Sequence, residues 1–367
     1  MKNWQKQNCN IRGRKLEKSI NRIDYLDGLR GLAAMMVVCV HSANFIEPVL
    51  LPNTVLSWLK LGRYGVQIFY IISSFTIMMS LDRLKNMRGG YSVFYLRRAF
   101  RILPVWYIAI ALMCLYNYFA RGTVASIGSV ITHLFTLHGL FPQYISDIIG
   151  QGWSIGIEVI FYLLVPYIVR RFRYKLDNYV KFIFWNVLCV WILNIVGAKI
   201  CGFLVPNMDD TFWYLWFPNQ LPAFSVGICL YIAIIRKQRI EDWKKSSKYL
   251  IGILILVFLN VSQVLTQSLI IAVLILILSK FSSRIIVNSL FKYIGKVSYG
   301  IYLFHMIIIF LLQDYGLMNY GDTVSLAVYF LVVPILSIGC GIIAYYSIER
   351  PLISLERKIE NKFIKPE

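Results

Sequence analysis

The sequence predicts an all-α membrane protein, a polytopic helical bundle of about ten transmembrane helices. Of its 367 residues, 58% are hydrophobic and only 15% are charged, whereas a soluble domain carries about a quarter charged residues. The mean hydropathy is +0.63. Apolar runs long enough to cross a bilayer recur along the whole chain, and basic residues gather between alternate pairs of these runs. This combination excludes an ordinary soluble enzyme.

Each span is predicted from a run of apolar residues that approaches the length of about 20 residues needed to cross a bilayer as a helix. The segment 126–141 is apolar, but it is short and interrupted by polar residues, so it predicts a re-entrant or interfacial helix. The ten predicted spans are 24–45, 66–81, 101–119, 153–169, 180–200, 220–236, 248–264, 266–281, 296–313 and 324–346.

The orientation follows from the distribution of lysine and arginine, which favour cytoplasmic loops. The N-terminal segment 1–23, the tail 347–367 and every second loop are rich in these residues. With ten spans they all fall on one side, which predicts that both termini are cytoplasmic and flank a membrane domain at 24–346. Basic loops beside an anionic leaflet account for the net charge of +20 without a nucleic acid partner.

The first span is expected to remain as an uncleaved helix, because Asp27 and Arg30 interrupt its apolar stretch and no clean cleavage site follows. The cysteines have no paired spacing and fall mostly within apolar runs. We expect them to be small buried side chains, with no metal site and no disulfide. The seven are Cys9, Cys39, Cys114, Cys189, Cys201, Cys229 and Cys340.

Two ionisable residues, Arg30 and His41, lie inside the first span. They are eleven residues apart, close to three turns, so they share a helix face and lie about 16 Å apart along its axis. Ionisable groups inside a membrane indicate function. An imidazole can act as a base or nucleophile, and a guanidinium suits phosphate. The alternatives are a histidine bonded to a backbone carbonyl, and an arginine in a structural ion pair with Asp24, Asp27 or Glu158.

A basic cluster precedes Pro104, where the third span begins on the predicted cytoplasmic side. It consists of Arg97, Arg98 and Arg101, of which the first and last share a helix face. Such a cluster would attract a polyphosphate ligand. The alternative is anchoring at the membrane surface.

The fourth span begins at Trp153 and repeats polar residues every four positions, at Ser154, Glu158 and Tyr162. These residues share one helix face, and Glu158 lies at a depth similar to that of His41. A carboxylate at that depth can orient an imidazole and stabilise its protonated form. The alternative is a carboxylate that pairs with a base for packing alone.

The remaining histidines lie in two places. His305, in the ninth span, is expected to line the same cavity as Arg30 and His41. His133 and His138 fall on the segment 126–141. There they either touch a substrate from the outer side or serve as interfacial polar residues.

Together, these residues resemble the acyltransferase type 3 family of integral-membrane acyltransferases, and the resemblance covers residues 22–351. Ser74 stands where the family usually has glycine, and Val159 and Ile160 replace polar residues. The matching pieces occur in the family's order at 26–31 with His41 downstream, 65–75, 97–104, 153–163, 220–227, 297–305 and 349–351.

The resemblance implies a multi-pass protein of the bacterial inner membrane that O-acetylates a surface polysaccharide such as O-antigen. The donor would be cytoplasmic acetyl-CoA, used as a substrate with no further cofactor, and the acceptor a polysaccharide or a lipid-linked glycan. His41 and Glu158 would be catalytic. The four arginines 30, 97, 98 and 101 would hold the donor phosphates, while Trp153, Ser154, Tyr162 and His305 would line the cavity.

Several alternatives stay open from the sequence. His41 either deprotonates the sugar hydroxyl, which we favour, or carries the acetyl group first. The donor could carry a longer acyl group, such as succinyl. A glycolipid transporter or flippase would also have ten spans and a charged track, and a regulatory protein could bind acyl-CoA without turnover. The enzyme interpretation requires Arg30 and His41 to face one shared cavity. The sequence identifies neither the sugar nor the oligomeric state.

Overall fold

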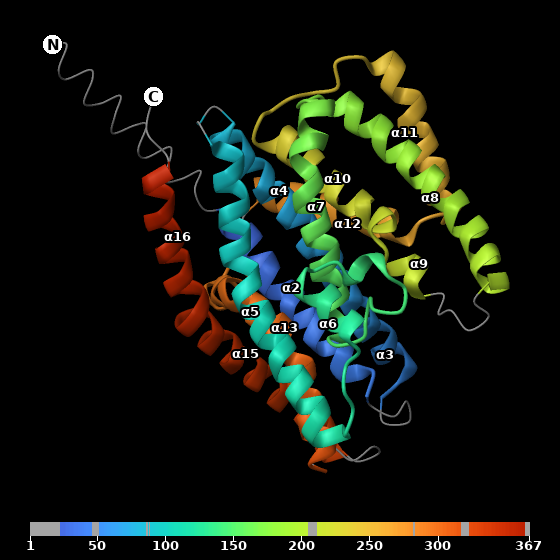
Figure 1. The fold of residues 1–367 in the computed structure, drawn as a ribbon. Coiled ribbons are helices and arrows are strands. Elements are labelled where there is room, and N and C mark those ends of the chain that lie inside the picture. Colours follow the sequence, from blue (N-terminus) through green and yellow to red (C-terminus); the bar gives the residue numbers. More distant parts are fainter. Residues whose placement is uncertain are drawn as a thin grey trace.

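The computed structural model is a bundle of long helices (Figure 1). It describes residues 23–45, 51–85, 87, 89–204, 211–281, 283–316 and 323–363. Across these residues it contains helices and turns but no strand, which confirms the all-α class. The α-helices are α2 (Asp24–Ala43), α3 (Asn53–Lys60), α4 (Gly65–Leu84), α5 (Gly90–Arg121), α6 (Ile127–Leu134), α7 (Trp153–Phe172), α8 (Leu176–Leu204), α9 (Thr211–Leu215), α10 (Phe217–Ile234), α11 (Trp243–Phe258), α12 (Gln263–Lys280), α13 (Ser289–Asp314), α14 (Thr323–Ala327), α15 (Val333–Ala344) and α16 (Arg350–Phe363).

Nine helical segments in the described ranges are long and apolar enough to cross a membrane, and they correspond to nine of the ten predicted spans. The exception is the predicted span 248–264. Its helix, α11, begins earlier because the Asp242 side chain accepts a hydrogen bond from the amide of Lys245, and it ends at Phe258 after 16 residues. Asn260 then adopts a positive φ of 51°, which is incompatible with a continuing helix. The sidedness of the termini stays a prediction.

The segment 126–141 does not cross the bundle as a single helix. It forms α6, capped by the Ser126 side chain, and then a 3₁₀ turn at His138–Leu140. Eight helical residues rise about 12 Å, less than half the hydrocarbon thickness of a bilayer. The segment therefore agrees with the prediction of a short, non-spanning helix.

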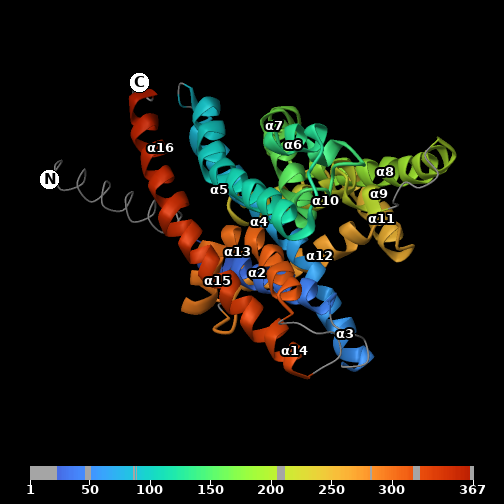
Figure 2. The same ribbon diagram turned by 60° about the horizontal axis from the view of Figure 1, so that its bottom comes forward.

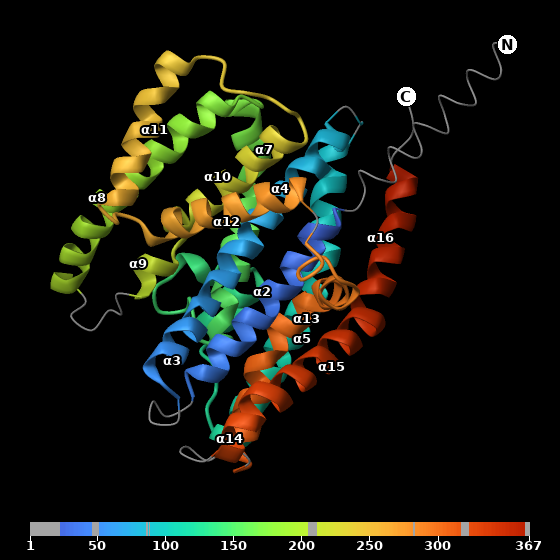
Figure 3. The same ribbon diagram turned by 180° about the vertical axis from the view of Figure 1, so that it is seen from behind.

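Helices α2 and α13 run parallel and in close contact (Figures 1 and 3). Gly31 and Gly295 permit this approach. A Cβ on Gly31 would lie 2.9 Å from the carbonyl carbon of Phe291, and one on Gly295 would lie 3.1 Å from the nitrogen of Gly31. Small residues allow such approaches between helices in membranes. The resulting register places the C-terminal part of α2 beside the middle of α13.

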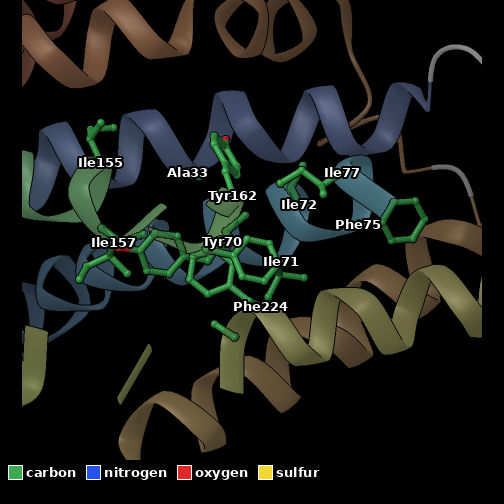
Figure 4. Packing of buried hydrophobic residues seen from close by; sticks show 14 of the residues in the cluster. Ala33, Tyr70, Ile71, Ile72, Phe75, Ile77, Ile155, Ile157, Tyr162 and Phe224 are labelled. Carbon is green, nitrogen blue, oxygen red and sulfur yellow. The ribbon is translucent and has the colours of Figure 1, made fainter. Parts of the chain in front are cut away.

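An aromatic cluster joins α4, α7 and α10 next to this helix pair. The ring of Phe224 stacks on Tyr70 at 4.4 Å between centroids and on Phe161 at 4.1 Å. Figure 4 shows Tyr70 and Phe224 packed beside Ile71, with Tyr162 of α7 close to them. These buried rings fix α7 against α4, and both helices contribute residues to the site described below.

Two pairs of helices lie at the edges of the bundle. Helices α8 and α11 pack side by side on one flank (Figures 1 and 3). On the other, α16 continues α15 through a π-helical turn at Tyr345–Glu349 and lies along α5 (Figures 1 and 2). Glu360 of α16 fixes this packing by accepting two hydrogen bonds from Arg97 of α5, at 3.0 and 2.5 Å.

Candidate active site

A cavity of about 80 Å³ lies between α2, α4, α5, α7 and α13. This volume holds a few water molecules or the reactive end of a larger ligand. Three guanidinium groups and a single carboxylate border it, so the cavity favours an anion. Its polar lining residues are Arg30, Tyr70, Ser73, Thr76, Arg98, Arg101, Ser154, Glu158, Tyr162, Ser298, Tyr299 and Tyr302.

Arg30 borders this cavity and also makes the local ion pair that the sequence left open. Its Nη1 donates to Oδ1 of Asp27 at 3.2 Å, and its Nη2 donates to Oγ1 of Thr76 at 3.3 Å. These contacts hold the guanidinium at the cavity wall. An arginine held in this way can still bind an anionic ligand with the rest of its planar donor group.

The predicted arginine cluster is divided by the structure. Arg98 and Arg101 line the cavity, and Nε of Arg98 is buried without a hydrogen-bond partner among the described residues. Arg97 instead pairs with Glu360 and borders an adjoining hollow of about 180 Å³, which Arg30 also lines. The predicted role of Arg97 in donor binding is therefore weaker than that of its two neighbours, because a carboxylate already holds its guanidinium.

Glu158 is bound to α4 and to its own helix. Its Oε1 accepts hydrogen bonds from Oγ of Ser73 and from the hydroxyl of Tyr162, each at 2.5 Å. The sequence predicts instead that this carboxylate orients His41. The structure does not show that pairing. The Glu158 carboxylate accepts hydrogen bonds from Ser73 and Tyr162, and a different residue hydrogen-bonds to the imidazole of His41.

The partner of His41 is His305. Nδ1 of His41 lies 2.7 Å from Nε2 of His305, with the rings nearly parallel and their centroids 4.9 Å apart. Nδ1 of His305 lies 3.3 Å from the carbonyl oxygen of Ile301. Because a carbonyl oxygen only accepts, this nitrogen carries the proton, and Nε2 of His305 must accept from Nδ1 of His41. Nε2 of His41 is then left with a lone pair, as a base or nucleophile requires.

The histidine pair lies just behind the cavity wall. The ring of Tyr302, which lines the cavity, lies 5.9 Å from the ring of His305 and 6.0 Å from that of Phe69 between centroids. Its hydroxyl bonds to Oγ of Ser154 at 2.6 Å and donates to the Gln151 carbonyl at 2.8 Å. Neither histidine borders the described cavity. The expectation that Arg30 and His41 face one shared cavity is therefore wrong for this structure, because Arg30 borders the cavity and His41 does not.

The remaining predicted residues also take definite places. Ser154 and Tyr162 line the cavity as expected, whereas Trp153 lies behind its wall, edge-on to Tyr70 at 6.3 Å. His305 does not line the cavity and supports His41 instead. The residues that sequence reasoning missed are Ser73, Thr76, Tyr299 and Tyr302, which lie in or next to two motifs, 65–75 and 297–305, but were given no role.

His133 and His138 are buried together, away from any outer substrate. Their rings stack at 4.2 Å between centroids, and both stack on Trp106. Nε2 of His138 lies 3.0 Å from the carbonyl oxygen of Gly152. Burial lowers the pKa of both histidines, that of His138 to about 4. These features favour a structural role in packing 126–141 on α5 and α7.

Comparison with known proteins gives this geometry a context. A family model described as an acyltransferase domain matches residues 23–346. A protein of Acidianus two-tailed virus, whose name proposes an acetyltransferase, is 25% identical over 84% of this chain and 91% of its own length. A Staphylococcus aureus (strain COL) protein, whose name proposes an O-acetyltransferase, is 24% identical over 91% of this chain.

Peptidoglycan O-acetyltransferase OatA of Listeria monocytogenes is 28% identical over 51% of this chain. The chain spans only 58% of the staphylococcal relative and 30% of the Listeria one. No solved structure matches. The family model nevertheless covers nearly the whole described bundle, including the arginine-lined cavity and the histidine pair. The chain therefore belongs to the acyltransferase domain family, as an all-α acyltransferase of the multi-pass membrane type.

Proposed function

We propose that this protein is a membrane O-acetyltransferase that moves an acetyl group from acetyl-CoA to a sugar hydroxyl of a surface polysaccharide, such as O-antigen, in the inner membrane of a bacterium. The observation that carries this proposal is the hydrogen-bonded pair of half-buried His41 and buried His305, close to Tyr302, which lines the arginine-rich cavity. The positive-inside rule supports a cytoplasmic position for the arginine end of the bundle, where acetyl-CoA is available.

Arg30, Arg98 and Arg101 are suited to hold the donor. Coenzyme A carries phosphates, and guanidinium groups bind phosphate through charge-assisted hydrogen bonds. The cavity, at about 80 Å³, accommodates the thioester end rather than the whole donor. The adjoining hollow of about 180 Å³ gives the remaining part a basic environment next to Arg30 and Arg83.

His41 serves as the general base in this proposal. Its Nε2 takes the proton of the sugar hydroxyl as the sugar oxygen bonds to the carbonyl carbon of the thioester. The carbon–sulfur bond then breaks, the acetyl ester stays on the sugar, and the thiolate takes the proton back from His41. His305 accepts a hydrogen bond from Nδ1–H throughout, which fixes the tautomer of His41 and stabilises its protonated form.

In this proposal Tyr302 moves during the reaction. Its ring lines the cavity and lies 5.9 Å from the ring of His305, so it is the side chain that a thioester bound in the cavity would displace on its way to His41. The hydroxyl contacts with Ser154 and Gln151 would hold it closed until then. Such a closed state would protect the thioester from water in the absence of the acceptor.

The decisive experiment uses purified protein in lipid nanodiscs with acetyl-labelled acetyl-CoA and the surface glycan. We expect label to move into the glycan, and His41→Ala to abolish this while Cys39→Ala, on the same helix, preserves it. A correctly inserted His41→Ala protein that transfers at the wild-type rate would show that the proposal is wrong. Donor binding without release of CoA would indicate a regulatory protein, and glycan translocation without CoA release a transporter. A labelled protein trapped without acceptor would indicate an acyl-histidine intermediate.

A further inference from the structure

A larger hollow lies at the other end of the helix pair from the arginines. It has a volume of about 410 Å³ and lies between the C-terminal ends of α5 and α13. In Figure 1 these two helix ends meet at the lower edge of the bundle, far from the first turns of α5 that carry the basic cluster. We call it the distal groove, and its lining includes Leu115, Tyr116, Phe119, Leu311, Asp314 and Tyr315.

The distal groove and the cavity lie on opposite sides of the histidine pair. Along α13, Tyr302 borders the cavity, His305 follows, and Asp314 borders the groove. Nine residues separate the last two, which is about 13 Å along the axis. Between them, Phe310 stacks on Tyr116 at 6.2 Å between centroids. Along the α13 axis, the groove therefore lies on the side of His305 away from the cavity.

The floor of the groove combines aromatic rings with a fixed carboxylate. The hydroxyl of Tyr116 donates to Oδ2 of Asp314, and Nε of Arg121 lies 3.9 Å from the same oxygen. Both contacts involve Oδ2, which leaves Oδ1 of a side chain that is 38% exposed to accept from a ligand. A sugar can place its C–H face on such rings while its hydroxyls donate to the carboxylate.

The rim of the groove adds an apolar surface, and a cation, Arg121, lies next to Asp314 of the lining. Phe119 is 79% exposed and Tyr315 is 78% exposed, and Leu115 extends the same face. The guanidinium of Arg121 stacks over Phe310 at 4.5 Å. A free sugar has no apolar chain that could pack against the apolar rim. A glycan joined through phosphate to a lipid complements all three parts, since its chain meets the rim, its phosphate meets Arg121 and its sugars meet the floor.

We propose that the distal groove binds the acceptor substrate as a glycan carried on a lipid phosphate, with its sugars against Tyr315 and Asp314. This inference rests on the proposed function for the reaction, but acceptor binding is measurable without turnover. The groove would hold the glycan so that its hydroxyl extends toward Nε2 of His41. Each of the two substrates would then be bound at its own end of the α2–α13 pair.

The test compares Tyr315→Ala with Tyr118→Ala, an exposed tyrosine that does not line the groove. With the lipid-linked glycan as variable substrate, we expect Tyr315→Ala and Asp314→Asn each to raise the acceptor KM about tenfold. The kcat and the donor KM should change less than about twofold. Tyr118→Ala should leave all three constants unchanged. Phe119→Ala should raise the KM of the lipid-linked glycan and leave that of the same glycan without its lipid unchanged.

The outcomes separate this inference from the proposed function. Unchanged acceptor KM in both Tyr315→Ala and Asp314→Asn would overturn the groove as acceptor site. Equal effects of Phe119→Ala on both glycans would overturn the lipid-carried acceptor. If the wild type shows no transfer at all, the proposed function fails. Photo-crosslinking of the lipid-linked glycan to the His41→Ala protein then tests, without turnover, whether the groove binds the glycan. Crosslinks at residue 315 would support it, and crosslinks elsewhere would overturn it.

Discussion

Gly31→Ala tests whether the spacing of α2 and α13 sets the geometry of the histidine pair. The added Cβ would come within 2.9 Å of the carbonyl carbon of Phe291 and 3.0 Å of the nitrogen of Gly295. Carbon atoms in good contact lie about 3.5 to 4.0 Å apart. The carbonyl oxygen of Phe291 lies closer still to the added Cβ. All three neighbours are backbone atoms of α13, so no side chain can turn away, and the helices must separate by at least roughly 0.5 to 1 Å.

That separation acts directly on the bond between the two imidazoles. It would lengthen the distance from Nδ1 of His41 to Nε2 of His305 from 2.7 Å to about 3.2–3.7 Å, at or beyond the limit of a good hydrogen bond. A catalytic group displaced by about 1 Å loses up to roughly 100-fold in rate. We therefore expect kcat for acetyl transfer to fall about 10- to 100-fold in Gly31→Ala.

Two other glycines supply controls for the same assay, which is acetyl transfer by purified, monodisperse protein. A Cβ on Gly28 would press on Ile286, which lies in the loop before α13 and can yield, so Gly28→Ala should lose much less activity. Gly339→Ala, on α15 with nothing within 4 Å, should be neutral or slightly stabilising. A well-folded Gly31→Ala protein with a rate within twofold of wild type would refute the link between helix spacing and the histidine pair.

Three further predictions concern His305, Glu360 and His138. His305→Leu should lower kcat about 10- to 100-fold with less effect on donor KM, and His305→Gln should restore part of the rate because its amide oxygen can accept from Nδ1–H of His41; equal rates for both would contradict a positioning role. Glu360→Gln should loosen α16, seen as faster limited proteolysis, and cost about 1 kcal/mol, since Arg97 is 36% exposed and its ion pair is partly screened; unchanged cleavage would contradict this. The folded-state pKa of His138 is about 4, below the usual 6.5. Its burial should therefore lower the free energy of unfolding as pH falls below 6.5, by up to about 1.4 kcal/mol per pH unit until pH 4. Melting temperatures of wild type and His138→Gln that fall in parallel over this range would contradict this.

The helical bundle could be predicted because each span carries its own signal. An apolar run of about 20 residues must satisfy its backbone within the membrane, and a helix does this locally. The seventh span failed for an equally local reason, since the cap at Asp242 starts α11 early and the helix ends at Phe258, before the positive φ of Asn260. Length and composition of 248–264 do not reveal such a shift, because the polar start of a helix adds nothing to its hydropathy.

The site could be predicted only where its residues share a helix. The face common to Ser154, Glu158 and Tyr162 follows from four-residue spacing, and the bond from Tyr162 to Glu158 agrees with it. The partner of His41 lies 264 residues away and depends on the register of α2 against α13. That register is set by the contact of Gly31 with Gly295, which spacing within one helix cannot show.

The parallel packing of α2 and α13 gives the site its polarity. In both helices the residues follow one order, with Gly31, next to Arg30, level with Gly295, then His41 with His305, then Phe45 with Phe310. An antiparallel pair would set the arginine of one helix beside the distal end of the other. Because the order is shared, the arginines that can bind an anion lie at one end and the aromatic groove at the other, with the imidazoles between them. Under the proposed function, an acyl group would be transferred in one direction along this helix pair, from the arginine end toward the groove.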